Sequence, residues 1–237
     1  MDSKDDFSVR RINSVRWILT FQVLLIVVSP LLQLVTGSQT VTNVLFWISL
    51  VGLSFVSFLI ITTGRLALVL GISIAGVLAI LQISASITSN QAISLIYFAG
   101  LAGVIGLVFC RFIRLLMKTR EVTLDTLLIG ISSYLMLAVF WAAMYSICTL
   151  LDPSAFSFSS ALQSTLEGRI VLEGKNAGLA IYFSTVTQTT LGYGDITPVS
   201  SLARMLVSAQ ALMGQIYVAI LIGRLVGLSI VSKNKEN

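Results

Sequence analysis

Histidine is absent from the sequence, and charged residues are scarce. Of the 237 residues, 11% are charged and 56% are hydrophobic. A water-soluble domain carries about 25% charged residues, so this composition excludes an ordinary soluble domain and a disordered chain. The absence of histidine removes the usual acid–base catalyst and the commonest zinc ligand, which argues against an enzyme. The net charge of +5 does not indicate nucleic-acid binding, because no soluble basic face is present. A membrane protein is therefore predicted.

Six apolar stretches are long enough to span a bilayer. A helix rises about 1.5 Å per residue and the hydrocarbon core is about 30 Å thick, so a span needs about 20 apolar residues. The fold class is predicted as an all-α membrane protein with six transmembrane helices. These helices are expected at Trp17–Val35, Val44–Thr62, Leu66–Ile87, Ala92–Cys110, Leu127–Leu151 and Leu202–Val231.

The positive charges predict the orientation. Twelve of the fifteen Lys and Arg residues fall on one side of the six-span arrangement. Lys and Arg concentrate on the cytoplasmic side of membrane proteins, so both termini are expected to be cytoplasmic. The expected location is the plasma (inner) membrane, with the lipid bilayer as a partner.

The stretch between the last two spans breaks the pattern. Residues 152–177 are polar and Ser-rich and predict an external loop. The apolar stretch 178–189 has 12 residues, or about 18 Å of helix, which crosses only half a bilayer. Non-helical backbone must follow at membrane depth, where it is tolerated only if it is buried in protein or lines a water-filled path. Residues 178–189 are therefore predicted to be a re-entrant pore helix.

A glycine-rich run, Thr190-Leu-Gly-Tyr-Gly-Asp195, follows this half-helix. Its two glycines reach backbone angles that other residues avoid. Alternating such conformations lets successive carbonyls point toward one axis, where they can replace the hydration shell of a monovalent cation. One chain supplies one row of carbonyls and cannot surround an ion, so several copies are expected to meet on the axis.

The run resembles the selectivity filter of potassium channels, whose pattern is T-V-G-Y-G-D. The layout resembles the six-helix branch of that superfamily, in a small bacterial form. The resemblance implies a homotetrameric pore that needs no cofactor, with K+ as the permeant ion. The filter would comprise Thr190, Leu191, Gly192, Tyr193 and Gly194, and K+ would be coordinated by the Thr190 hydroxyl and the carbonyls of Thr190, Leu191, Gly192 and Tyr193. Filter support would come from Asp195, Thr189 and Tyr182.

The sequence departs from the family pattern at three places. Leu191 stands where Val or Ile is usual, and Tyr182-Phe183 stands where many members have a Trp pair. The Tyr182 hydroxyl would then hydrogen-bond Asp195. Val186 stands where some members have an acid, so filter inactivation that depends on that acid is not expected.

This resemblance divides the chain into parts. The expected parts are a cytoplasmic tail (1–16), a four-helix membrane domain (17–110), a cytoplasmic linker (111–126), a pore domain (127–231) and a short tail (232–237). Within the pore domain the parts are helix 127–151, external loop 152–177, pore helix 178–189, filter 190–195 and helix 202–231. The tails are too short for a cytoplasmic regulatory domain.

The last span carries the residues expected to control opening. Gly214, in its middle, is either a hinge or a close-packing position, since glycine also lets helices approach. Gly223 and Gly227 are expected where the inner helices cross. Gln210 and Gln215 are polar in an apolar span, and they either line the cavity or hydrogen-bond between subunits.

A working voltage sensor is not expected. Span four contains no charge, and no Asp or Glu occurs between Asp6 and Glu121 to pair with one. The basic residues that follow span four are interpreted as cytoplasmic anchors. The function predicted is passive, K+-selective conduction that is not strongly voltage-gated. The alternatives are a nonselective cation channel, a potassium transporter or a channel-associated membrane subunit. No nucleic-acid partner is expected, and no regulatory partner is identified.

Overall fold

The computed structural model describes residues 65–88, 90–119, 123–160 and 177–236. The N-terminal tail and the first two predicted spans lie outside these residues, as does most of the predicted external loop.

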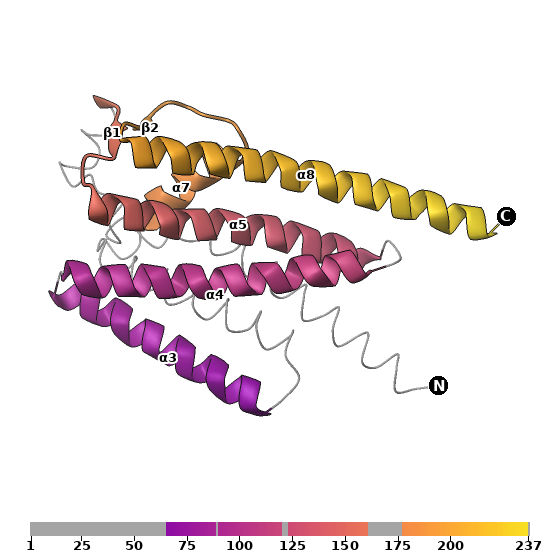
Figure 1. Cartoon of the computed structure of the whole chain (residues 1–237), viewed down its shortest axis with the longest axis horizontal. Helices are drawn as coiled ribbons and strands as arrows, with labels where there is room; N and C mark the ends of the chain where they lie inside the picture. The colour runs from indigo at the N-terminus through magenta and orange to yellow at the C-terminus, as the bar shows by residue number, and fades with distance from the viewer. Residues whose placement is uncertain (1–64, 89, 120–122, 161–176, 237) are drawn as a thin grey trace, which may run out of the picture.

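The described chain is mostly helical (Figure 1). Its long helices are α3 (Arg65–Thr88), α4 (Gln91–Lys118), α5 (Leu124–Leu151) and α8 (Ser201–Glu236), and its short helix is α7 (Ala177–Gln188). All four long helices are long and apolar enough to cross a membrane. The prediction of a mostly helical chain is therefore confirmed, and four of the predicted spans correspond to helices of membrane-spanning length among the described residues.

Helix α4 is longer than the sequence pattern predicts. It begins at an N-cap, where the Asn90 side chain accepts hydrogen bonds from the backbone N–H groups of Ala92 and Ile93. It then continues past Cys110 to Lys118, so the first part of the predicted linker is helical. The physical reason is that Phe112 and Leu116 lie one turn apart and are buried, which extends the apolar stripe of the helix beyond its first charge.

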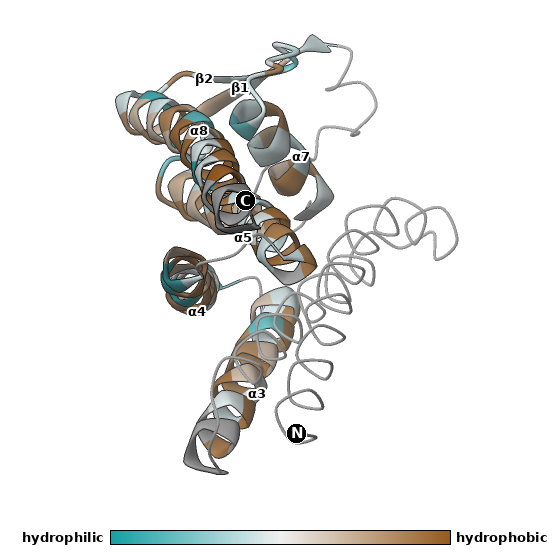
Figure 2. Ribbon diagram, turned by 90° about the vertical axis from the view of Figure 1, so that its right-hand side faces the viewer, coloured by the Kyte–Doolittle hydropathy of each residue, from teal (hydrophilic) through white to brown (hydrophobic). Residues whose placement is uncertain are grey.

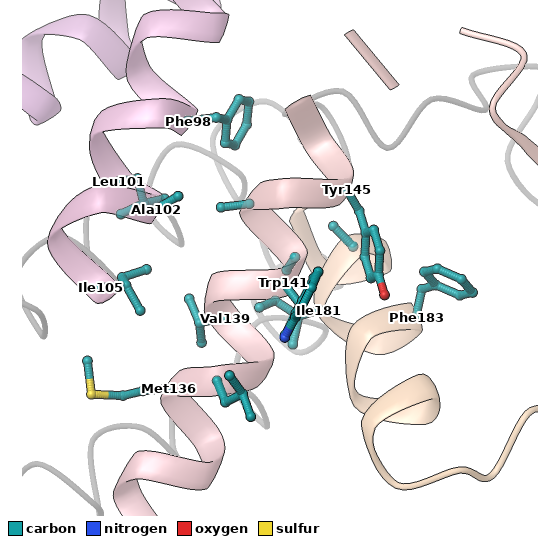
Figure 3. Close-up of a cluster of buried hydrophobic side chains, with 14 of the residues drawn as sticks. Phe98, Leu101, Ala102, Ile105, Met136, Val139, Trp141, Tyr145, Ile181 and Phe183 are labelled. Carbon is teal, nitrogen blue, oxygen red and sulfur yellow. The ribbon is translucent and has the colours of Figure 1, made fainter. Parts of the chain in front are cut away.

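The hydrophobic core lies mainly between α4, α5 and α7 (Figure 3). One face of α4 presents Phe98, Leu101 and Ile105 to α5, and all three are fully buried. On its other side α5 contributes Tyr145, whose ring contacts Phe183 of α7 with centroids 5.1 Å apart. Helix α5 is thus the central helix of the described chain, and it fixes α7 on one side and α4 on the other.

Hydrophobic residues also cover much of the outside of the long helices (Figure 2). In α3 and α8 the majority of the large apolar side chains with described surroundings are exposed. Examples are Val69, Ile80, Met205, Leu212 and Ile220, each more than half exposed. A surface of this kind suits contact with lipid or with other membrane helices.

A two-stranded antiparallel pair departs from the all-α prediction. Strand β1 (Phe156–Phe158) pairs with β2 (Ile196–Pro198), and Ser157 lies opposite Thr197. Strands of three residues are too short to show an alternating hydrophobic pattern, which is why the sequence does not reveal them. The pair joins the chain just after α5 to the chain just before α8.

Candidate functional site

The predicted filter segment begins at the C-terminal end of α7. The Leu191 N–H donates to the Val186 carbonyl (2.9 Å) and the Thr190 N–H donates to the Thr187 carbonyl (3.0 Å). These two bonds form a Schellman motif, which ends a helix by placing one residue in the left-handed conformation. That residue is Thr190, with φ +59°.

Threonine is an unusual choice for this position. The left-handed region is costly for a β-branched residue and normally favours glycine. Such strain persists only where the surrounding structure imposes it, and it is found preferentially at functional sites. Glycine at position 190 would relieve the strain but remove the hydroxyl. In the single chain the Thr190 hydroxyl donates to the Thr189 carbonyl (2.6 Å), and the left-handed conformation follows from the way α7 ends.

Positive φ recurs at every second residue of the segment. Gly192 has φ +58° and Gly194 has φ +77°. Within the described residues, Thr190 is the only non-glycine with positive φ, so Leu191 and Tyr193 lie outside the left-handed region. Left-handed residues thus alternate with others from 190 to 194. This is the backbone alternation that the sequence predicts for a row of aligned carbonyls.

The side chains of this segment are exposed in the single chain. Leu191 is 55% exposed and Tyr193 is 66% exposed. The Tyr193 ring stacks on the Tyr182 ring of α7, with centroids 6.4 Å apart and planes 6° apart. Thr189 instead turns back to its own helix, because its hydroxyl donates to the Thr185 carbonyl (2.8 Å).

Asp195 is fixed at the far end of the segment by three hydrogen bonds. The Tyr182 hydroxyl donates to its Oδ2 (2.7 Å), which is the hydrogen bond expected from the resemblance. The Ile196 N–H donates to its Oδ1 (3.0 Å), and the Ser159 N–H donates to its carbonyl (2.8 Å). Burial and the bond to Asp195 raise the pKa of Tyr182, which lies outside the four long helices, to about 12. Its hydroxyl therefore remains a donor at neutral pH.

Tyr182→Phe is expected to loosen this end of the segment. The substitution removes a donor from a carboxylate, and such charged hydrogen bonds contribute about 1.5–3 kcal/mol. We expect hydrogen exchange at the Ser159 and Ile196 amides to accelerate by about tenfold or more. Tyr217→Phe is the control, because it removes a hydroxyl of α8 that donates to the Gly130 carbonyl of α5, away from this segment. Equal exchange in Tyr182→Phe and the wild type would contradict this role of Tyr182.

A cluster of buried polar side chains lies behind the segment, where α5, α7 and α8 meet. Its members, which we call the polar seam, are Tyr145, Ser184, Gln188 and Gln210, each at most 1% exposed. The Gln210 amide nitrogen donates to the Ser184 carbonyl (2.9 Å) and hydroxyl (2.8 Å), and its oxygen accepts from the Tyr145 hydroxyl. In this chain Gln210 therefore bonds within its own subunit, and both sequence interpretations of Gln210 are wrong. Gln215 is exposed.

Gln210 stands out in the sequence, but its partners do not. A polar residue in an apolar span normally faces protein rather than lipid, and that signal is visible in the sequence. The partners lie 26 positions away on α7 and 65 positions away on α5. Only the packing of the three helices brings them together.

Gly214 lies where α8 packs tightly against the end of α7. A Cβ atom at this position would lie 2.8 Å from the Gln188 carbonyl oxygen and 3.0 Å from its Cγ. Helix α8 runs unbroken from Ser201 to Glu236 through this residue. Close packing, which is one of the two roles expected from the sequence, therefore explains why a glycine stands at position 214. Its action as a hinge stays a prediction.

The other two glycines of α8 have open surroundings in the single chain. A Cβ atom at Gly223 or Gly227 would meet nothing within 4 Å. This holds for the described residues of one chain, so the place of these glycines at a helix crossing also stays a prediction.

Arg224 joins the end of α8 to the end of α4. Its guanidinium donates to the carbonyls of Leu116 (3.1 Å), Met117 (2.8 Å) and Thr119 (2.7 Å). These carbonyls belong to the last turn of α4 and to the residue that caps it, where the regular helix bonds run out. The Leu116 carbonyl also accepts from the Thr119 N–H and hydroxyl. A positive charge at a helix C-terminus is also favoured by the helix dipole. From the sequence, Arg224 is one of the twelve basic residues that predict the orientation, and nothing in the sequence predicts this contact.

Arg224→Gln is expected to weaken the α4–α8 contact. The free energy of unfolding is expected to fall by about 1.5 kcal/mol per chain. This is the lower end of the range for a charged donor, because the guanidinium is partly exposed. A lower thermal unfolding midpoint in detergent would report it. Arg204→Gln is the matched control on the same helix, since Arg204 is exposed and makes one long bond (3.4 Å) to the Pro198 carbonyl. Equal midpoints for the two variants would show that the Arg224 bonds contribute nothing.

Known proteins match the half of the chain that carries this site. The ion channel family matches residues 122–228, which include α5, α7, the predicted filter segment and most of α8. Protein LctB from Bacillus caldotenax is 30% identical over 113 residues, which cover 46% of this chain and 75% of LctB. No solved structure matches the chain significantly.

Proposed function

Because this chain belongs to the ion channel family, we propose that it conducts K+ passively and selectively as a homotetramer. The K+ ligands in this proposal are the Thr190 hydroxyl and the carbonyls of residues 190–193. Gly194 ends the row, and Asp195 lies at its outer mouth. K+ is the permeant ion, and no other cofactor is needed.

The observation that carries the proposal is the alternation of positive φ at Thr190, Gly192 and Gly194. An alternating backbone presents several carbonyl oxygens on one side, and oxygen ligands of this kind can replace the water around K+. The segment also starts at the C-terminal end of α7, which is the negative end of the helix dipole and favours a nearby cation.

Exposed apolar residues support the association of several copies. Helix α8 leaves most of its large apolar side chains uncovered, and Leu191 and Tyr193 of the predicted filter segment are uncovered too. Four copies around an axis would bury part of this surface and would place four carbonyl rows around one ion path. The exposed large apolar residues of α8 are Leu202, Met205, Leu212, Met213, Ile216, Ile220, Ile222, Val226 and Ile230.

The proposed channel opens without a strong dependence on voltage. Moving one charge through the membrane field is worth about 2.3 kcal/mol per 100 mV, so a sensor needs several charges inside the membrane. Helix α4 carries none between Gln91 and Cys110, and its basic residues gather at its C-terminal end. These residues would lie at the cytoplasmic surface of the plasma membrane, with both termini on that side.

Flux into liposomes tests the proposal. Purified tetramer in vesicles with a K+ gradient is expected to pass K+ and to be blocked by barium, while Na+ flux stays near that of empty vesicles. Equal K+ and Na+ fluxes would indicate the nonselective alternative. Flux that requires a coupled ion would indicate a transporter, and no flux from intact tetramer would indicate a channel-associated subunit.

A further inference from the structure

The polar seam connects the last two turns of α7 to α8. Ser184 and Gln188 lie one turn apart on α7, and Gln210 lies within reach of both: its amide nitrogen is 2.8 Å from the Ser184 hydroxyl and 3.4 Å from the Gln188 Oε1. One turn further along α8, Gly214 packs against the Gln188 carbonyl. Helix α8 therefore contacts the end of α7 at two successive turns.

The same side chains also bind α7 to α5. The Ser184 hydroxyl donates to the Ala138 carbonyl (2.6 Å), and the Gln188 amide donates to the Tyr134 carbonyl (2.7 Å). Ser184 thus accepts from α8 and donates to α5 through one oxygen atom. The rotation of α7 and its height along the bundle are both fixed, because each of these bonds is directional.

The part of the polar seam on α7 lies directly before the predicted filter in the chain. Gln188 is the last residue of α7, and the alternating backbone starts two residues later at Thr190. Carbonyl ligands must be placed accurately to replace a hydration shell. A change in the rotation or height of α7 would move Thr190 and every carbonyl after it.

We propose that Gln210 is a positioning residue for the filter, which sets the selectivity of conduction through Ser184 and Gln188 without touching the ion. The inference rests on the proposed function. It assigns part of the selectivity to an amide on α8, outside the filter sequence. A purely stabilising role would make Gln210 variants less stable but would leave ion discrimination unchanged.

Gln210→Met tests this directly, because methionine keeps the approximate volume and length but cannot hydrogen-bond. We expect the ratio of K+ to Na+ permeability of the intact tetramer to fall by about tenfold, which corresponds to about 1.4 kcal/mol. Ser184→Ala is the milder second variant and is expected to lower the ratio by about threefold, since the amide keeps its bonds to the Ser184 carbonyl and Gln188.

Two matched controls carry the same substitutions outside the seam. Gln82→Met replaces a buried glutamine of α3, and Ser146→Ala replaces a fully buried serine whose hydroxyl bonds within α5 to the Ala142 carbonyl. Both controls are expected to keep the wild-type permeability ratio, whatever their effect on the thermal midpoint.

A Gln210→Met tetramer with the wild-type ratio would overturn the inference. If that variant does not assemble, Ser184→Ala decides: a lowered ratio supports the positioning role and an unchanged ratio overturns it. If the wild type is selective and both Gln210→Met and Ser184→Ala keep its permeability ratio, the inference is wrong and the proposed function stands. A wild type that does not discriminate K+ from Na+ contradicts the proposed function, and the inference with it.

Discussion

Gly192→Ala is expected to abolish K+ conduction while leaving the helices folded. Gly192 has φ +58°, and a left-handed conformation costs an L-residue with a Cβ about 1–2 kcal/mol. The proposed tetramer contains four copies, so the cost is about 4–8 kcal/mol around one filter. The segment is expected to leave its alternating conformation, which would disperse the carbonyls.

The measurement is K+ flux per tetramer in liposomes, which should fall by about 100-fold or more. Strain is the cause expected within one chain, because an added Cβ at Gly192 meets none of the described residues within 4 Å. Gly103→Ala on α4 is the matched control, since its Cβ also has open space but its φ is not positive. Unchanged flux and an unchanged K+ to Na+ ratio in Gly192→Ala would refute the filter assignment.

Gly214→Ala is expected to destabilise the protein and reduce its flux. The new Cβ would lie 2.8 Å from the Gln188 carbonyl oxygen, which is backbone and cannot rotate away. Overpacking of this kind costs about 1–3 kcal/mol per chain. It would push α8 away from the end of α7 and disturb the polar seam one turn away.

The same variant separates the two roles considered for Gly214. If Gly214 is only a hinge, alanine should raise the thermal midpoint, because alanine favours a helix by about 1 kcal/mol over glycine. If close packing dominates, the midpoint should fall and K+ flux per tetramer should drop by about tenfold. Differential scanning fluorimetry and the liposome assay read the two quantities on one preparation. A raised midpoint would contradict the packing role.

Much of the helical architecture follows from the sequence. The predicted spans Leu66–Ile87 and Leu127–Leu151 fall within α3 and α5, and the predicted half-helix 178–189 corresponds to α7 at Ala177–Gln188. These elements are predictable because bilayer thickness sets the length of a helix and a 12-residue helix is too short to span it. The alternating conformation at Gly192 and Gly194 is predictable too, since only glycine reaches it cheaply.

The contacts that hold the site are less predictable. Gln210 pairs with Ser184 across 26 positions, and Arg224 pairs with Leu116 across 108 positions. Hydropathy marks both side chains as unusual, but it contains no information on which helix faces which. The left-handed Thr190 was also missed, because its conformation comes from the end of α7 and not from its own propensity. The sequence does predict the Tyr182–Asp195 bond, through the family resemblance.

The most direct test of the central claim is the reversal potential of single channels with K+ on one side of a planar bilayer and Na+ on the other. If the backbone of residues 190–194 forms a K+ filter, current should reverse only at a large potential that opposes K+ movement. The reversal should be the same whether the holding voltage is positive or negative. Reversal near zero, with Na+ and K+ carrying similar currents, would contradict the claim that this backbone is a K+ filter.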